Sequence, residues 1–456
     1  MKTLMGVVLF GPALFLIACS TNPHATPPPS KAQATTAHTK LAPHLSEAPT
    51  GFDNSSNAVV DDQTHRSDQA KFEQYEAISD GLGPLFNAQS CRECHQSPVT
   101  GGVSQVTELR VGHKSSDGKF QTAEISIHHG SEIIKGRSLV NQRAICPNAA
   151  FPSVEIQERV PDSETIRTFR TSLGILGDGF VEAVDDSTLI ALSNKQCRQD
   201  EKICGLIVRV PILEAPGETR VGRFGWKSQH ASLLSFSGDA YLNEIGITNR
   251  LFPDEVTDLC NTVAEPNDRG GADGFADIDR FARFIRATKA PARDAQQAGS
   301  ATAKAGETLF AKIGCGICHV PTLTTAASGT VINGGKFTIP DALGSKTFHP
   351  YSDFILHDIG TGDGIVVAMQ EHYGKRMYQT QWRDFSLEAY QAAANRMRTT
   401  PLWGVRMQTM FMHDGASLTF RDAILRHRGE ASNVTEHFEN LSEADQSAIV
   451  EFLKSL

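Results

Sequence analysis

The sequence predicts a mainly α-helical protein with two helical domains and a β-containing insertion in the first. Apolar residues with helical spacing precede each of two Cys-x-x-Cys-His segments, Cys91 to His95 and Cys315 to His319, which lie about 220 residues apart. Between these segments, runs rich in β-branched residues predict short strands. The 456 residues, 40% hydrophobic and 21% charged, provide enough apolar material for two or three domains and exclude a disordered chain.

The net charge of the chain indicates which class of partner to exclude. The net charge is −9, from 43 basic and 52 acidic side chains. This balance offers no basic surface for phosphates, so no nucleic-acid partner is expected.

The first 18 residues have the features of a secretory signal peptide. An apolar run from Leu4 to Ala18 follows Lys2 and is too short to span a membrane. Its end, Leu16-Ile17-Ala18-Cys19, resembles the lipobox of bacterial lipoproteins, which implies acylation of Cys19. With Ser20 in the next position, the resemblance implies an outer-membrane anchor, with the chain in the periplasm. The alternative is an ordinary signal peptide with an incidental cysteine.

Residues 19–66 are expected to be a disordered tether. They are rich in Pro, Thr, Ser and Ala and have no helical or alternating pattern. The scattered His24, His38 and His44 could bind metal, but histidines in a linker are usually solvated.

Residues 67–295 are expected to form the first domain. Helical spacing from Phe72 to Ile78 leads into the first Cys-x-x-Cys-His segment. Strands are expected at 108–113, 123–127 and 207–213, and helical spacing returns at 257–262 and 278–285. The Ala- and Gln-rich stretch 291–305 is expected to link this domain to the second.

Residues 296–456 are expected to form the second domain. Leu309, Phe310 and Ile313 share a helix face before Cys315. At the C-terminus, Ser442 is a candidate N-cap for a helix whose apolar face comprises Ile449, Phe452, Leu453 and Leu456. This helix is expected to pack on the one before Cys315, as a cytochrome c domain requires.

The two Cys-x-x-Cys-His segments predict two covalently bound haem c groups. Cysteines three positions apart lie on one helical turn, where both thiols can add to the two vinyl groups of a haem, and the next histidine can ligate the iron. Cys91, Cys94 and His95 form one such set, and Cys315, Cys318 and His319 the other. A zinc site would need closer pairs, and a thioredoxin-like dithiol would need a preceding strand.

Further motifs resemble those of the di-haem oxidoreductase family. They begin at Gly222 (GRFGWK), Asn243 (NEIGIT), Tyr351 (YSDFILHDIG), Thr400 (TPLWG) and Phe411 (FMHDG). Members are often labelled thiol oxidoreductases and are distantly similar to bacterial di-haem cytochrome c peroxidases and to the methylamine-utilisation di-haem enzyme. The resemblance extends from about residue 70 to the C-terminus.

The resemblance implies roles for single residues. In the peroxidases, a His-Asp-Gly segment precedes the distal ligand of the C-terminal haem by fourteen positions, and counting from His413 leads to His427. The implied iron ligands are therefore His319 and His427, with Met410 or Met412 as the alternative to His427. Two imidazoles give a lower potential than a His/Met pair.

Two further residues take catalytic roles by the same resemblance. Trp226 would relay electrons between the haems, and Glu244 would move a proton between the oxygens of bound peroxide. The alternatives are a core tryptophan and a capping glutamate. The glutamine that often follows this tryptophan is replaced by Phe236.

The sixth position of the N-terminal haem stays open in the prediction. A vacant position would let the iron bind peroxide, whereas His113, His128 or His129 as a ligand would make the protein an electron carrier. The same resemblance implies that His357 lines the haem interface, where hydrogen bonding is expected and ligation is the alternative.

The remaining cysteines predict two disulfides in an oxidising compartment. The short separation favours Cys197 with Cys204, which leaves Cys146 with Cys260. A redox-active pair is the alternative, but no Cys-x-x-Cys spacing supports it.

The sequence therefore predicts an exported di-haem oxidoreductase that is peroxidase-like, with electrons passing from the C-terminal to the N-terminal haem. The electron donor would be a small redox protein or a small molecule, and a calcium ion is a further candidate cofactor. The alternative is a non-catalytic di-haem electron carrier linked to metal redox or iron uptake.

Overall fold

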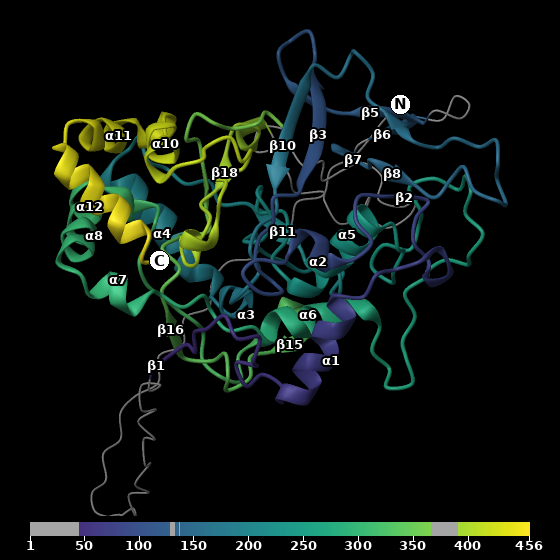
Figure 1. Ribbon diagram of the computed structural model, residues 1–456, viewed down its shortest axis with the longest axis horizontal. Coiled ribbons are helices and arrows are strands. Elements are labelled where there is room, and N and C mark those ends of the chain that lie inside the picture. Colours follow the sequence, from purple (N-terminus) through teal and green to yellow (C-terminus); the bar gives the residue numbers. More distant parts are fainter. Residues whose placement is uncertain (1–44, 128–132, 136, 366–390) are drawn as a thin grey trace, which may run out of the picture. The chain divides into compact units, whose positions relative to one another are not determined.

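Short helices and many small sheets alternate along the chain (Figure 1). The computed structural model describes residues 45–127, 133–135, 137–365 and 391–456. It is 32% helical and 16% strand. The predicted class, mainly α with two cytochrome c-like haem domains and β structure only in an insertion of the first, is therefore wrong. Strands of two or three residues occur up to β18 (Met397–Arg398), and such strands are too short for an alternating pattern in the sequence.

Three helices form the apolar centre of the N-terminal half. They are α1 (Asp62–Phe72), α5 (Leu233–Ile245) and α6 (Asp277–Ala287), and α6 packs against both others. The apolar face predicted for 278–285 is buried in α6. This packing supports the short α2 (Cys91–Cys94), because both of its cysteines lie against the same core.

The main ladder is built around β3 (Thr107–Lys114). It pairs with β10 (Ile166–Thr171), β4 (Phe120–Thr122) and β7 (Leu139–Val140), all antiparallel. Figure 1 shows β3 and β10 side by side. A second small sheet places β5 (Glu124–Ile127) between β6 (Ile133–Lys135) and β9 (Glu158–Arg159). The strands predicted at 108–113 and 123–127 are present.

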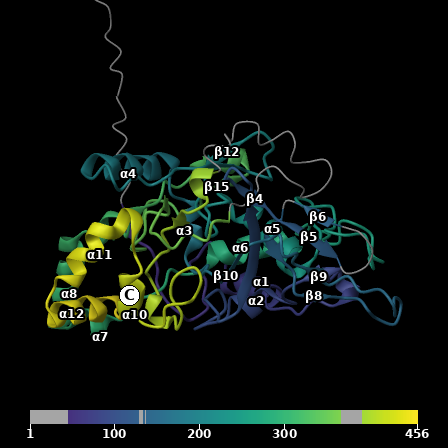
Figure 2. The same cartoon turned by 90° about the horizontal axis from the view of Figure 1, so that it is seen from above.

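Helices of the C-terminal half form a second packed group. The helices α8 (Ala301–Ile313) and α12 (Glu443–Leu453) lie side by side in both views (Figures 1 and 2). Phe310, Ile449 and Phe452 are buried between them. The Ser442 side chain accepts a hydrogen bond from the Asp445 amide, as expected for an N-cap.

The other elements are short. The helices are α3 (Asp178–Glu182), α4 (Asp186–Gln199), α7 (Ala295–Gly299), α10 (Phe420–Leu425) and α11 (Ser432–Glu439), with 3₁₀ turns at 78–80, 315–317, 333–335, 405–407 and 429–431. The strands are β1 (Ser46–Glu47), β2 (Leu85–Phe86), β8 (Arg143–Ala144), β11 (Arg209–Pro211), β12 (Thr219–Val221), β13 (Leu323–Thr324), β14 (Val331–Ile332), β15 (Phe337–Thr338), β16 (Lys346–Phe348) and β17 (Leu356–His357).

Some predicted boundaries were wrong. The tether predicted for 19–66 ends earlier, because β1 pairs with β16 and the Asn57 side chain donates hydrogen bonds to two backbone carbonyls. The expected helix at 72–78 is absent, since α1 ends at Phe72. Residues 257–262 are not helical, and Cys260 has a positive φ. The stretch 291–305 is partly helical rather than a plain linker, because it contains α7 and the start of α8.

All described residues belong to one compact unit, 43–456. Within it, the boundary between residues 295 and 296 stays a prediction. None of the described helices has the length and apolar character needed to cross a membrane. The signal peptide, Cys19 and the three histidines of the predicted tether lie outside the described residues.

Candidate active site

A large apolar cavity opens beside the second Cys-x-x-Cys-His segment. It measures about 1330 Å³, including the space at its open mouth. Cys315, Cys318 and His319 lie on its wall. The remaining lining is largely apolar and comes from several stretches of the chain, among them Phe310, Leu402, Phe411, Ile424 and Leu453. An apolar cavity with two free thiols and an imidazole in its wall suits a flat, hydrophobic cofactor that is attached through sulfur.

His319 and His427 face each other in this cavity. Their ring centroids are 6.5 Å apart and the ring planes are inclined by 61°. Two metal–nitrogen bonds of about 2 Å each, with half of each ring beyond them, account for this separation. The geometry thus fits a metal ion held between the two imidazoles.

Hydrogen bonds orient both rings for such a role. The Nδ1 of His319 is 2.9 Å from the Tyr351 carbonyl oxygen, and the Nδ1 of His427 is 2.8 Å from that of Ala423. A carbonyl can only accept, so each Nδ1 carries the proton and each Nε2 keeps a free lone pair. Burial lowers the pKa of both imidazoles, that of His319 to about 4, which keeps the rings neutral.

Arg398 supplies a buried positive charge in the wall of the same cavity. Its Nε donates to the Gly225 carbonyl, and its backbone amide donates to that of Trp226. Among the described residues, no carboxylate forms an ion pair with its guanidinium. Burial lowers the pKa of Arg398 to about 10. An anionic group of a bound cofactor, such as a haem propionate, would compensate this charge.

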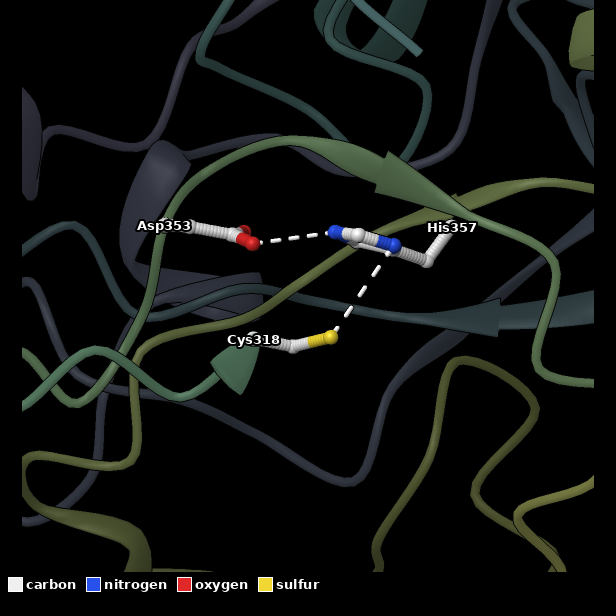
Figure 3. Close-up of side chains that lie close together, drawn as sticks. All are labelled: Cys318, Asp353 and His357. Carbon is white, nitrogen blue, oxygen red and sulfur yellow. Dashed lines mark hydrogen bonds and ion pairs between the residues drawn. The ribbon is translucent and has the colours of Figure 1, made fainter. Parts of the chain in front are cut away.

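His357 lies beside Cys318 and Asp353 (Figure 3). It is held between two carboxylates. Its Nε2 is 2.9 Å from Asp353 and its Nδ1 is 2.8 Å from Glu430. Burial alone would lower the pKa of His357, but the Asp353 carboxylate raises it well above its ordinary value. The residue therefore forms the hydrogen bonds that the sequence suggested, as an imidazolium held by two anions.

The ligand atoms of Cys318, Asp353 and His357 are also close enough together to hold one metal ion, and this is the one such group among the residues that the structure describes. Calcium prefers oxygen ligands alone, so this cluster does not suit it. The calcium ion stays a prediction.

The first Cys-x-x-Cys-His segment lies on α2 and the residue after it. The Nδ1 of His95 is 3.4 Å from the Gly102 carbonyl oxygen, so Nε2 is again the available nitrogen. Burial lowers the pKa of His95 to about 4. Burial also raises the pKa of the Cys94 thiol to about 12. The segment thus presents two protonated thiols and a neutral imidazole.

Glu244 lies near this segment, toward the end of α5. Asn87 Nδ2 donates to its Oε2 at 3.0 Å, and its side chain is hydrogen-bonded to Glu108. Burial and the charge of Glu108 raise the pKa of Glu244 well above the ordinary value. Both carboxyl groups act electrostatically on the Cys94 thiol and therefore lie near the first Cys-x-x-Cys-His segment. A carboxyl group that keeps its proton at neutral pH can act as a general acid.

Trp226 lies in the wall of the C-terminal cavity. Its Nε1 donates to the Thr171 carbonyl at 2.8 Å, and its ring lies edge-on to His413 with centroids 6.0 Å apart. It also lines a smaller neighbouring pocket together with Ser97 and Gly102, which follow the first haem segment. The indole therefore lies between the surroundings of the two segments.

The alternative ligands have other surroundings. Met412 lines the C-terminal cavity, whereas Met410 lines a different pocket. His113 Nδ1 is 3.0 Å from a carboxylate oxygen of Glu164. His128 and His129 lie outside the described residues. Phe236 stacks on Phe224 within the core.

The cysteines divide as the sequence suggested. Disulfides join Cys146 to Cys260 and Cys197 to Cys204. The free thiols of the described residues are the four of the two Cys-x-x-Cys-His segments.

Sequence reasoning missed several residues around both segments: Asn87, Glu108, Arg110, Asp353, Arg398 and Glu430. Only Asp353 lies in a recognised motif. Glu108 and Arg110 were placed in the strand predicted at 108–113. An acidic and a basic residue two positions apart are not a motif that indicates a site.

Comparison with protein families identifies the class. Residues 145–456 match the model of the family described as di-haem oxidoreductase, putative peroxidase. The matched range exceeds half of the chain, so the protein belongs to the di-haem oxidoreductase family. The first Cys-x-x-Cys-His segment precedes this range. No curated protein matches the sequence significantly.

Two solved structures are similar to this chain. One is Kuenenia stuttgartiensis hydrazine synthase, 14% identical, with a TM-score of 0.37 over 97% of this chain and 100% of that one. The other is a MauG-like protein associated with microbial copper homeostasis, 12% identical, with a TM-score of 0.38 over 92% of this chain and 95% of that one.

Proposed function

We propose that the protein is an exported di-haem c-type oxidoreductase with peroxidase-like activity. The observation that carries this proposal is the difference between its two Cys-x-x-Cys-His sites. The C-terminal site has a second imidazole, His427, opposite His319. The N-terminal site has instead a buried carboxyl group, Glu244, with a raised pKa beside Cys94. The C-terminal site thus has a second potential iron ligand, whereas the N-terminal site has a side chain that can transfer protons.

The attachment residues follow from the two segments. Cys91 and Cys94 would hold one haem and Cys315 and Cys318 the other, with His95 and His319 as proximal ligands. When bound, the two haems supply the redox chemistry, with electrons passing from the C-terminal to the N-terminal haem and peroxide reduced at the latter.

The chain's own residues perform the remaining tasks. His427 would hold the C-terminal haem iron together with His319 and so keep peroxide away from that site. Trp226, fixed by its hydrogen bond to Thr171, would provide an aromatic path between the two sites. Glu244 would move a proton between the oxygens of peroxide, because a protonated carboxyl group within hydrogen-bonding reach can donate its own proton to one oxygen while its carbonyl oxygen accepts a proton from the other.

Export and anchoring belong to the same proposal. Acylation of Cys19 would hold the protein at a membrane, more specifically the outer membrane, with residues 45–456 in the periplasm. A small redox protein or a small molecule would supply electrons there. The mass of the N-terminal peptide of the exported protein tests this anchor, since a diacylated Cys19 supports it and an unmodified peptide overturns it.

Peroxide-dependent oxidation of a reduced donor by the di-haem protein tests the activity. Glu244→Gln should lower turnover by about 10²- to 10⁴-fold, the usual contribution of a general acid–base group, and leave both haem spectra unchanged. The control is Glu436→Gln, at an exposed position of α11.

Electron paramagnetic resonance separates the enzyme from the non-catalytic carrier. A high-spin signal that appears on half-reduction and changes with peroxide supports the enzyme. Two low-spin signals unaffected by peroxide would show that the protein is an electron carrier.

A further inference from the structure

Two carboxyl groups meet beside the N-terminal haem segment. Glu108 comes from β3 and Glu244 from α5, and their side chains are joined by a hydrogen bond. Both act electrostatically on the Cys94 thiol. The contact therefore lies at the site where peroxide would be reduced, and Glu108 has had no role so far.

A hydrogen bond between two carboxyl groups needs a proton. An ionised carboxylate can only accept, so two ionised side chains would repel each other. Two buried carboxyl groups that act on each other in this way are therefore expected to hold one proton between them. The neighbouring side chains decide which residue carries the proton.

Arg110 holds Glu108 in the ionised form. Its Nε lies 2.7 Å from Oε1 of Glu108 and its Nη2 lies 2.9 Å from Oε2, a two-pronged ion pair. Burial alone would raise the pKa of Glu108, but Arg110 outweighs it and the pKa is lowered. The two side chains are two residues apart on β3, so they lie on the same face of the strand.

Arg110 also lowers the pKa of Glu244, but its effect is smaller than those of burial and of the Glu108 charge, which raise it. Besides its contact with Glu108, the Glu244 side chain accepts a hydrogen bond from the Asn87 amide, a neutral donor. Burial and the negative charge of Glu108 both favour its protonated form. Arg170 on β10 also acts on Glu108. The neighbouring Cys94 thiol faces both carboxyl groups and, in addition, Glu93 on α2 and Arg143 on β8.

We propose that Glu108 and Glu244 form a carboxyl pair that holds a single proton, with Arg110 fixing Glu108 as the anion and Glu244 as the acid. Glu108 is a positioning residue, because it acts through Glu244. This inference rests on the proposed function for its use, since a peroxide-reducing site needs an acid that is protonated at neutral pH. The presence of this proton on the pair does not depend on the proposed peroxidase activity.

Infrared spectroscopy of the di-haem protein tests the pair. The wild-type minus Glu244→Gln difference spectrum at neutral pH should contain the carbonyl stretch of one protonated carboxylic acid, since other buried acids such as Asp178 contribute equally to both spectra. In Glu108→Gln the band should remain at low pH but titrate at least about one pH unit lower, because the neighbouring negative charge is gone. Arg110→Gln should raise the pH at which the pair takes up its second proton, because Glu108 loses its cation.

Glu93→Gln is the matched control, since Glu93 also acts on Cys94 and does not contact Glu244 in the described structure. This variant should leave the band unchanged. The pair would be refuted if the wild-type minus Glu244→Gln difference spectrum shows no carboxylic-acid band at neutral pH. It would also be refuted if the titration is the same in wild type and Glu108→Gln. Loss of peroxidase activity alone would not move the band, so the two proposals fail separately.

Discussion

At the residue scale, the two imidazoles of the C-terminal cavity define the character of that site. His427→Met should raise the reduction potential of the C-terminal haem by a fraction of the roughly 0.8 V that axial ligands span, because thioether ligation favours the reduced iron. Spectroelectrochemical titration measures the change. Met412→Leu, in the same cavity, should leave the potential and the low-spin spectrum unaltered. A changed spectrum in this control would identify Met412 as the ligand instead.

Asp178 gives a pH-dependent contribution to stability. Burial raises its pKa from 3.8 to about 7, against the opposing charge of Arg398. The folded state therefore binds the proton more tightly than the unfolded state, so stability is full below about pH 4 and falls as the pH rises to about 7. At about 1.36 kcal/mol per pKa unit, the loss is a few kcal/mol at most.

Asp178→Asn should flatten this slope and stabilise the protein above pH 7. Denaturant unfolding at a series of pH values measures both effects. Asp162→Asn, at an exposed position, should keep the wild-type slope. The same slope in Asp178→Asn would show that another group titrates.

Single residues were predictable from the sequence where their chemistry is local. Cys91, Cys94 and His95 are adjacent in the chain, so their spacing alone predicts their joint role. The partner of Glu244 was not predictable, because Glu108 lies 136 positions earlier and on another element, β3 rather than α5.

At the element scale, the packing of α8 on α12 depends on a glycine. A methyl group at Gly306 would collide with the carbonyl group of Ala448. Gly306→Ala should therefore push the helices apart and lower the free energy of unfolding by about 1–3 kcal/mol, despite the better helix propensity of alanine. The thermal midpoint of unfolding reports the change.

Gly299 in α7 offers the matched comparison, because a methyl group there would meet open space. Gly299→Ala should be neutral or stabilise the protein by up to about 1 kcal/mol. Equal effects at both glycines would contradict the close helix contact.

Helices with a clear amphipathic pattern were predictable as elements. The faces of α6, α8 and α12 were recognised because each has several apolar residues at helical spacing. Strands such as β13 and β17 have only two residues, and such a length cannot show a period of two. The fold class was misjudged because these small sheets recur along the whole described chain.

At the scale of the whole molecule, the two haem segments are made complete by distant parts of the chain. His319 meets His427 from beyond α10, and the N-terminal segment meets Glu244 from α5. Each site is therefore assembled by the fold, although its attachment residues are consecutive. Because the cysteines of each segment are close together in the chain, those of one segment can be replaced while those of the other stay in place.

Two haems per chain should be found in the protein produced with a cytochrome c maturation system. Cys315→Ser/Cys318→Ser should reduce the covalently bound haem from two to one per chain, measured by mass and by the pyridine haemochrome spectrum. The rate of peroxide turnover should also fall, because the C-terminal haem that would pass electrons to the N-terminal haem is missing. Cys197→Ser/Cys204→Ser removes a cysteine pair outside both segments and should keep two haems. Two haems in the first variant, or one in the second, would contradict the assignment of the cysteines.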